Sequence, residues 1–354
     1  MPFNVFDTHH LLMVVEQLTP APSFLLNRYF PTNAASDIFS TDDVLVEFRD
    51  GSKKLAPFVA PRKGGVTMLR KGYTMERYTP PFVAPRRELT IDDMQKKGCG
   101  EALYSKLTPA QRQNVLLMKD AEELGDFITR REEAMAAEIM LNGACVMKHI
   151  ADDADAGDEM EVRYYTGDAN PSVYAPDVKW DQPDADIIGD LDQMVQMLVR
   201  KGLRASELVC SPDVADAIVN NAAIKELLNI RNYHVGDVSP TELHPSAAIV
   251  AKLNVRGRVI SIISYDETYT DDAGDDQLYI PSGKCVMTAP AAGRTLYGAV
   301  SQVEQSDGAV HTYPGKRVPK YISDANTNVR TLTVSSRPLP MPNAKGSFIS
   351  AEVL

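Results

Sequence analysis

One stretch, TPAQRQNVLLMKDAEELGDFITRREEAMAAEIMLNG at residues 108–143, predicts an unusually long helix. Thr108 suits the N-cap, Pro109 suits the first helical position, and Gln111 completes a capping box with Thr108. Apolar residues then recur mostly at spacings of three, four or seven, and Asn142-Gly143 is a good C-terminal stop. At ~1.5 Å per residue the helix would be roughly 50 Å long, whereas an average helix has about a dozen residues.

The sequence after this helix predicts a β region, then a mixed α/β region, then a return to β structure. An acidic loop at 151–159 would join the first two strands, and a polar turn, DETYTDDAGDD, would join two later ones. The predicted strands are Cys145–Ile150, Met160–Tyr165, Glu207–Ser211, Val255–Tyr265, Gln277–Thr288, Val329–Arg337 and, after a proline-rich break, Ser347–Val353, with helices over 186–201 and from Ser211-Pro212 onward.

The sequence before the helix contains an internal echo, because Phe58-Val-Ala-Pro-Arg62 recurs as Phe82-Val-Ala-Pro-Arg86. Glycines and β-favouring residues lie between the two copies. The pattern predicts the rising and returning arms of a long β-hairpin. The predicted hairpin has too few large apolar residues to build a core of its own. We therefore expect it to project and to be stabilised by a partner.

The first forty-five residues mix apolar clusters with prolines, among them Phe24, Tyr29 and Phe30. We expect an extended arm that lies on another surface rather than an independent fold. The N-terminus has no basic region ahead of its apolar residues and does not resemble a signal peptide. No apolar run approaches the ~18 residues of a membrane helix.

The composition is that of a folded globular protein: of 354 residues, 44% are hydrophobic and 24% charged. Its length predicts two or more packed regions. Four widely spaced cysteines without a CxxC motif form neither a disulfide framework nor a zinc site, which suits a reduced cytoplasm.

The net charge of −11 is unevenly distributed, because residues 48–112 carry fourteen Lys and Arg against six Asp and Glu, a net charge of +8. The basic residues are not interleaved with aromatic residues, which disfavours nucleic-acid recognition. We therefore expect the basic segment to dock onto the acidic part of a second copy. The predicted subunit-interface residues are Arg62, Lys63, Arg70, Lys71, Arg77, Arg86 and Arg87 of this segment, with Phe24, Tyr29 and Phe30 of the arm.

No motif in the sequence predicts a catalytic, cofactor or metal site. The loop at Asp152–Glu159 fails the EF-hand pattern, because alanines occupy the next two ligand positions after Asp152, and Asp271–Asp276 fails in the same way. We expect the first segment to be a solvated acidic turn and the second to be a hairpin turn. The six histidines lack ligand spacing, and GxSxG, Walker and GxGxxG motifs are absent from the sequence. We predict no enzyme activity and no cofactor.

In their order and spacing these features resemble the major capsid proteins of tailed bacteriophages, with the HK97-like fold, and more closely the lambda-type major head protein family. The resemblance covers nearly the whole chain. It is carried by Phe24-Leu-Leu-Asn-Arg-Tyr-Phe30, the paired Phe-Val-Ala-Pro motifs, Arg130-Arg-Glu-Glu-Ala-Met135 with Leu141-Asn-Gly143, and Ser336-Arg-Pro-Leu-Pro340 within the terminal segment Lys316–Leu354.

The resemblance implies an α+β fold in five parts. These are an N-terminal arm (1–47), an E-loop hairpin and its connection (48–107), a spine helix with P-domain strands and the acidic loop (108–183), an α/β A-domain (184–305), and a P-domain return with the C-terminal strands (306–354).

The resemblance also implies the function: hexamers and pentamers assembled into an icosahedral head shell around packaged double-stranded DNA. Its partners would be further copies, a portal, a scaffold and a decoration protein, with DNA enclosed without sequence-specific binding and no membrane contact. The protein would be made in the bacterial host cytoplasm and located in the virion head. Some relatives form a Lys–Asn cross-link; Lys71 lies near the hairpin tip, but no acceptor is identified. An encapsulin-like compartment and a metal-dependent hydrolase are the alternatives.

Overall fold

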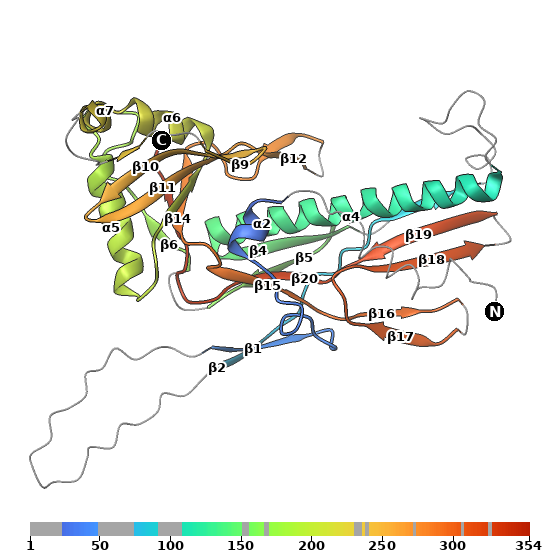
Figure 1. The fold of residues 1–354 in the computed structure, drawn as a ribbon. Helices are drawn as coiled ribbons and strands as arrows, with labels where there is room; N and C mark the ends of the chain where they lie inside the picture. The colour runs from blue at the N-terminus through green and yellow to red at the C-terminus, as the bar shows by residue number, and fades with distance from the viewer. Residues whose placement is uncertain are drawn as a thin grey trace, which may run out of the picture.

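The predicted long helix is confirmed as α4, Pro109–Asn142, and the rest of the elongated molecule is arranged along it (Figure 1). Thr108 Oγ1 accepts the N–H of Gln111, and Gln111 Oε1 accepts the N–H of Thr108, so the capping box is formed. Gly143 ends the helix in the left-handed region, with φ 67°. The computed structural model describes residues 23–48, 74–90, 108–150, 156–165, 170–229, 236–237, 241–271, 274–305, 308–324 and 328–354.

A three-stranded sheet lies along the N-terminal half of α4, with strand order β18–β19–β3. Its inner residues Leu332 and Val334 pack with the apolar residues of the helix, which the three- and four-residue spacing had placed on one face. The strands are β3 (Arg86–Leu89), β18 (Val318–Asp324) and β19 (Val329–Ser335), and the helix contributes Leu117, Ala121, Leu124 and Ile128.

The α/β region forms an eight-stranded mixed sheet with helices α5, α6 and α7, near the C-terminal end of α4 (Figure 1). The predicted helix over 186–201, the buried strand at Glu207 and the helix after Ser211 are all confirmed. The elements are α5 (Ile187–Arg200), α6 (Pro212–Asn220) and α7 (Ala222–Asn229), and strands in the order β6 (Ser172–Tyr174), β21 (Ile349–Glu352), β14 (Lys284–Thr288), β7 (Glu207–Cys210), β11 (Arg258–Tyr265), β10 (Ala247–Val255) and β8 (Gly236–Asp237), with β9 (Thr241–His244) also on β10.

Two strand predictions in this region are wrong in their extent. The predicted strand from Val255 is interrupted at once, because Arg256 and Gly257 have φ of 47° and 79° and form a two-residue turn between β10 and β11. The predicted strand from Gln277 divides into β13 (Asp276–Leu278) and β14, and β7 separates β14 from β11. β13 instead pairs with β12 (Thr268–Thr270), so the polar segment is a hairpin turn, as predicted.

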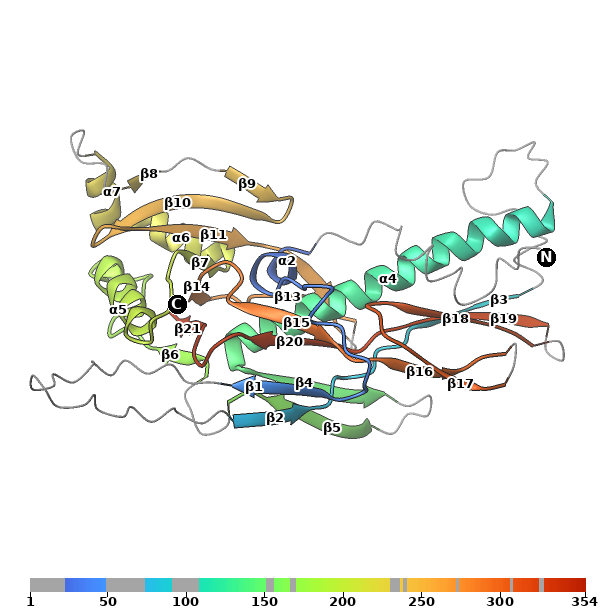
Figure 2. The same ribbon diagram turned by 60° about the horizontal axis from the view of Figure 1, so that its bottom comes forward.

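The base of a hairpin is formed by β1 (Val44–Phe48) and β2 (Thr74–Tyr78), which pair antiparallel. Val44, Val46 and Tyr78 are buried in the same core as Cys145 and Val162 of the paired strands β4 (Ala144–Ile150) and β5 (Ala156–Arg163). The ring centroids of Tyr78 and Tyr164 lie 5.2 Å apart. In Figure 2 the two strand pairs lie against each other.

The strands that pair, β1 and β2, are not the two Phe-Val-Ala-Pro segments that were predicted to form the hairpin arms. The returning strand is β2, and the second Phe-Val-Ala-Pro copy lies beyond it, where Val83 bridges to Ser336 and β3 pairs with β19. The first copy, and residues 49–73 generally, lie outside the described residues. The echo therefore does not mark two opposed strands.

The proline-rich segment predicted as a break is a strand, β20 (Pro338–Pro342), which pairs with β15 (Gly293–Tyr297). Its three prolines alternate with Leu339 and Met341, so the missing N–H groups fall on one side of the strand. On that side the carbonyls of Pro340 and Pro342 accept the hydroxyls of Tyr164 and Tyr165, at 2.6 and 2.7 Å. A second small ribbon is formed by β16 (Val300–Val303) and β17 (Val310–Tyr313).

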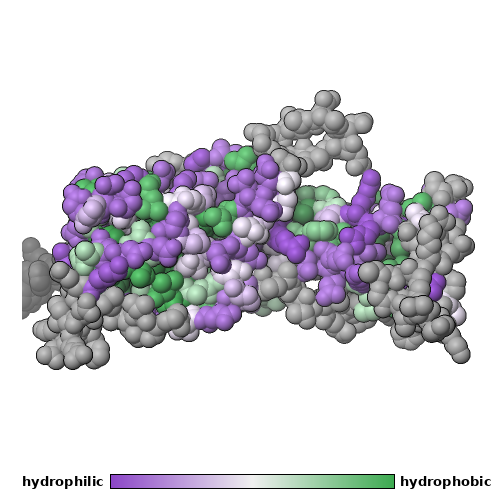
Figure 3. Space-filling view, turned by 90° about the horizontal axis from the view of Figure 1, so that it is seen from above, coloured by the Kyte–Doolittle hydropathy of each residue, from purple (hydrophilic) through white to green (hydrophobic). Residues whose placement is uncertain are grey.

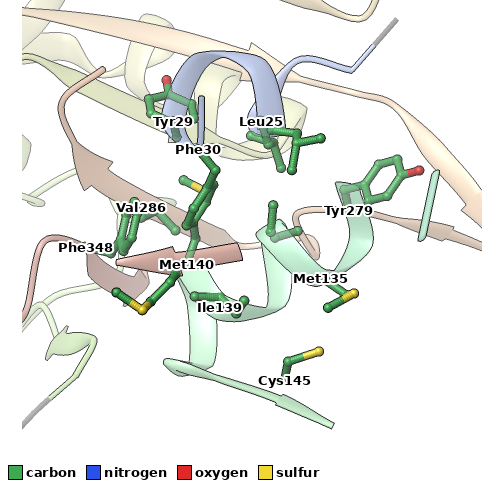
Figure 4. Close-up of a cluster of buried hydrophobic side chains, with 14 of the residues drawn as sticks. Leu25, Tyr29, Phe30, Met135, Ile139, Met140, Cys145, Tyr279, Val286 and Phe348 are labelled. Carbon is green, nitrogen blue, oxygen red and sulfur yellow. The ribbon is translucent and has the colours of Figure 1, made fainter. Parts of the chain in front are cut away.

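The largest core lies where the arm and α4 meet the strand pairs β1–β2, β4–β5 and β15–β20 and one face of the eight-stranded sheet. Figure 4 shows Leu25 and Phe30 of the arm facing Ile139 and Met140 of α4, with Phe348 beside Phe30. The rings of Phe30 and Phe348 stack with centroids 5.3 Å apart. Among the described residues, no helix combines the length and the apolar character that a membrane span needs.

Candidate functional site: the arm, the hairpin and the acidic residues of the long helix

The arm contains a short helix, α2 (Leu25–Tyr29), whose first turn is capped by a distant residue. Phe24 occupies the N-cap and makes no side-chain cap hydrogen bond. Instead, the Glu133 carboxylate of α4 accepts the N–H groups of Phe24, Leu25 and Leu26 at 3.0, 2.6 and 2.9 Å. These are N–H groups that a helix start leaves without an intrahelical partner, so α4 supplies the missing cap.

The other end of α2 is attached to the eight-stranded sheet. Glu207, at the start of β7, accepts both Arg28 Nε, at 2.7 Å, and Arg28 Nη2, which form a bidentate ion pair. The Tyr29 hydroxyl donates to the same carboxylate at 2.7 Å. Burial and the neighbouring Glu207 charge raise the pKa of Tyr29, so it remains a donor. The arm is therefore fixed to both α4 and the sheet.

The three arm residues predicted at a subunit interface lie in the core of the subunit instead. Phe24 is 5% exposed, and Tyr29 and Phe30 are fully buried. The expectation that they contact a second copy is therefore corrected, because the chain itself provides their apolar partners. The sequence showed that these residues need a surface to cover them, but not that α4 and β15 provide it.

The basic residues that the structure describes have different surroundings. Arg87 donates to Asp120 at 2.8 Å and also contacts Glu123, so it ties β3 to α4. Arg77 pairs with Asp43 at the hairpin base while remaining largely exposed, and Arg86 is exposed on β3. The positions of Arg62, Lys63, Arg70 and Lys71 lie outside the described residues.

Sequence reasoning missed a buried ion pair between α4 and Arg317, the residue directly before β18. Arg317 Nη1 and Nη2 donate to Glu132 at 2.7 and 2.8 Å, and Nη2 also donates to Thr129 Oγ1 at 3.2 Å. A signal was available, because Glu132 lies four residues after Ile128 and three before Met135, within the apolar stripe. A carboxylate in a buried stripe needs a cation or several donors.

Four carboxylates of α4 thus hold three segments that are remote in the sequence. Asp120 and Glu123 hold β3, Glu132 holds Arg317 directly before β18, and Glu133 holds the arm. This arrangement positions parts of the chain relative to α4. Among the described residues, no group of three or more His, Cys, Asp or Glu could hold a metal ion.

Several apolar side chains remain exposed on the projecting ribbons. Leu45 and Met75, on the outer face of the hairpin base, are 54% and 50% exposed. Val303 and Val310, paired across β16 and β17, are 49% and 68% exposed. On the face seen in Figure 3, hydrophobic residues form small groups among hydrophilic ones. A two-stranded ribbon with an apolar outer face gains stability when another surface covers it.

Comparisons with known proteins extend over nearly the whole chain. The family described as phage major capsid protein E matches residues 7–353. The major capsid proteins of Enterobacteria phage P21 and Escherichia phage lambda are 22% and 21% identical to this chain, and each match covers 99% of both chains.

Solved structures have the same fold. A prophage protein of Escherichia coli CFT073, described as a capsid protein, superposes with a TM-score of 0.67 at 14% identity, covering 98% of this chain and 99% of that one. A phage-related protein of Bordetella bronchiseptica gives a TM-score of 0.52 at 10% identity, covering 99% and 98%.

Proposed function

The chain belongs to the phage major capsid protein E family and is a major capsid protein of a phage head, and we propose that it assembles as hexamers and pentamers into a closed icosahedral shell around packaged double-stranded DNA. The family match over residues 7–353 is the observation that carries this proposal. The predicted lambda-type family and HK97-like fold are confirmed by these relatives and by the prophage structure.

We propose that the five sequence-defined parts act as assembly units. The hairpin at 48–107 would be the segment that reaches a second copy. Its charge supports this role, because residues 48–112 have a net charge of +8 while the whole chain has −11. Segments of opposite charge on neighbouring copies attract each other and set their relative position.

Two basic residues in the described part of this segment are already paired with acidic residues of the same chain. Arg87 is engaged with Asp120 and Glu123 of the same chain, and Arg77 with Asp43. The contact with a second copy would therefore depend mainly on Arg62, Lys63, Arg70 and Lys71. Because exposed ion pairs contribute only ~0.2–1 kcal/mol each, several must act together.

We propose a portal, a scaffold and a decoration protein as further partners, with DNA enclosed without sequence-specific binding. An acidic body supports this reading of the DNA contact, because phosphates are attracted by clusters of Lys and Arg rather than by carboxylates. The alternative of an encapsulin-like compartment shares the fold, but the matching family and the curated relatives are phage capsid proteins. The hydrolase alternative has no metal-ligand cluster among the described residues to support it.

Expression of the full chain, alone and with a scaffold, tests the proposal. We expect sedimentation and negative-stain microscopy to show capsomers or closed shells. A well-folded monomer at every concentration and condition tested would contradict shell assembly. Shells isolated from phage-producing cells should contain DNA; shells that contain a protein cargo instead would favour the encapsulin-like alternative.

A further inference from the structure

A cluster of ionisable residues lies where the arm, α4 and the eight-stranded sheet meet. The hydroxyl of Tyr265, at the end of β11, lies 2.9 Å from Glu133 Oε1 and 3.3 Å from Glu267 Oε2. A phenol has one proton to donate, so it can serve only one of these two carboxylates at a time. With both carboxylates ionised, the cluster is one proton short.

One added proton completes a continuous chain of hydrogen bonds. A protonated Glu267 would donate to Tyr265 Oη, and Tyr265 would donate to Glu133. Glu133 would stay free to accept the three N–H groups of α2. The Glu267 side chain is 28% exposed, so a proton can reach it from solvent, whereas the Glu133 residue is only 2% exposed.

We propose that Glu133 and Glu267 share one bound proton through Tyr265, and that this proton stabilises the seated position of the arm helix α2. The proton comes from solvent and is released to it, so the cluster acts as a proton-binding site. The arm helix α2 is seated within one subunit, so proton binding there does not depend on shell assembly.

Among the described residues, no Lys or Arg forms an ion pair with Glu133 or Glu267, although the charge of Arg130 acts on the neighbouring Tyr279. His244 Nδ1 lies 4.0 Å from Glu267 Oε2 and accepts the N–H of Ser246 at 3.3 Å. Tyr279 stacks on Tyr265 and donates its hydroxyl to the carbonyl of Arg130 at 3.4 Å. The cation of α2, Arg28, is paired with Glu207 on the far side.

Electrostatics agree with this geometry. Burial, with a contribution from the nearby Glu267 charge, raises the pKa of Glu133 from 4.5 to about 7, against the opposing effect of its N–H and O–H donors. The seated arm therefore binds a proton more tightly than an arm that has moved away and left the carboxyl in water. Seating weakens as the pH rises from 4.5 to about 7, and is weakest above that.

Amide hydrogen exchange at residues 24–26 of the full chain tests the proposal, because Glu133 accepts these N–H groups. After correction for the intrinsic rate, we expect exchange to be roughly tenfold to thirtyfold faster at pH 8 than at pH 5.5, the change that a shift of this size implies. In Glu267→Gln the amide can donate to Tyr265 permanently, so exchange should be slow at both pH values. Glu133→Gln replaces one of the two acceptor oxygens by an NH2 group, so it cannot accept all three N–H groups and should exchange fast at both pH values.

Glu122→Gln is the matched control, because Glu122 is an exposed carboxylate on the same helix. It should keep the wild-type ratio between the two pH values. The proposal is overturned if Glu267→Gln keeps that ratio, or if Glu122→Gln abolishes it. Circular dichroism of each variant establishes the fold, and because Glu267 is partly exposed its variant remains informative even if Glu133→Gln fails to fold.

Discussion

Glu132 and Glu133 are adjacent in the sequence, but they stabilise different parts of the molecule in different ways. Glu132 is neutralised by the guanidinium of Arg317, whereas Glu133 is held by three backbone N–H groups and a phenol. A buried carboxylate can be stabilised by a cation or by several donors. Two neighbouring positions can therefore connect α4 to the segment that enters β18 and to the arm.

Removing Arg317 should be strongly destabilising. The Arg317 side chain is 15% exposed and that of Glu132 is 1% exposed, so Arg317→Met leaves a buried charge without its partner. We expect a loss of about 3–5 kcal/mol in the free energy of unfolding. The double variant Arg317→Met with Glu132→Leu should recover much of it. Urea unfolding of the subunit measures the free energy of unfolding of both variants. An Arg317→Met variant within roughly 0.5 kcal/mol of the wild type, as a surface substitution would be, would contradict this role.

The buried cysteines should be chemically inert. Cys145, Cys210 and Cys285 are buried, and burial raises the pKa of all three thiols, that of Cys285 to about 12. Little thiolate is available at neutral pH, and thiolate is the reactive form. A thiol reagent should therefore label at most Cys99 in the native protein and all four cysteines after denaturation. Labelling of two or more per native chain would contradict this, as would particles that fall apart in a reducing agent.

At the scale of the elements, the sequence predicts best where the signals are local. The capping box at Thr108 and Gln111 and the stop at Gly143 gave both ends of α4. β20 could not be predicted in this way, because its prolines normally interrupt a sheet and its partner β15 lies some forty-five residues away in the sequence. The pairing of β1 with β2, rather than of the two Phe-Val-Ala-Pro copies, likewise depends on contacts with β4 and β5.

The charges of the candidate site could be predicted from the sequence, but the residue that each charge contacts could not. The basic segment was evident from composition, yet the attachment of Arg87 to Asp120 depends on where β3 lies along α4. Phe24, Tyr29 and Phe30 were recognised as residues that need cover, but the sequence did not show whether the cover belongs to the same chain. Such distinctions depend on contacts between residues that are distant in the sequence.

Among the elements, the hairpin is the one whose charge should affect assembly most. Arg70→Glu with Lys71→Glu should leave the subunit folded and impair shell assembly, because attraction to an acidic neighbour becomes repulsion. Wild-type assembly should also respond to ionic strength, since salt screens exposed pairs. Circular dichroism tests the fold, and particle counts by microscopy test assembly.

A double variant with the same charge change is the control for the hairpin. Lys225→Glu with Arg258→Glu reverses two exposed charges of the α/β region and should affect assembly less. Normal shells in normal yield from the hairpin variant would show that its charges only keep a solvated loop soluble. An equal loss of shells from both double variants would show that net charge, not the hairpin, controls assembly.

At the scale of the whole molecule, the shape is that of a subunit built to contact its neighbours. The long helix, the sheet along it and the α/β region provide the packed cores, while the hairpin base and the β16–β17 ribbon extend from them (Figure 1). These extensions carry exposed apolar residues such as Leu45 and Val310. Contacts with further copies would bury them, so the lone chain is expected to be less stable than the shell.

Electron cryomicroscopy of the assembled full chain tests the central claim most directly. We predict a closed icosahedral shell of hexamers and pentamers, with residues 49–73 of each subunit lying on an acidic surface of a neighbour. A reconstruction in which this segment contacts only its own subunit would contradict the proposed docking of the hairpin onto a second copy. A protein that remains a folded monomer, with and without scaffold, would contradict the account as a whole.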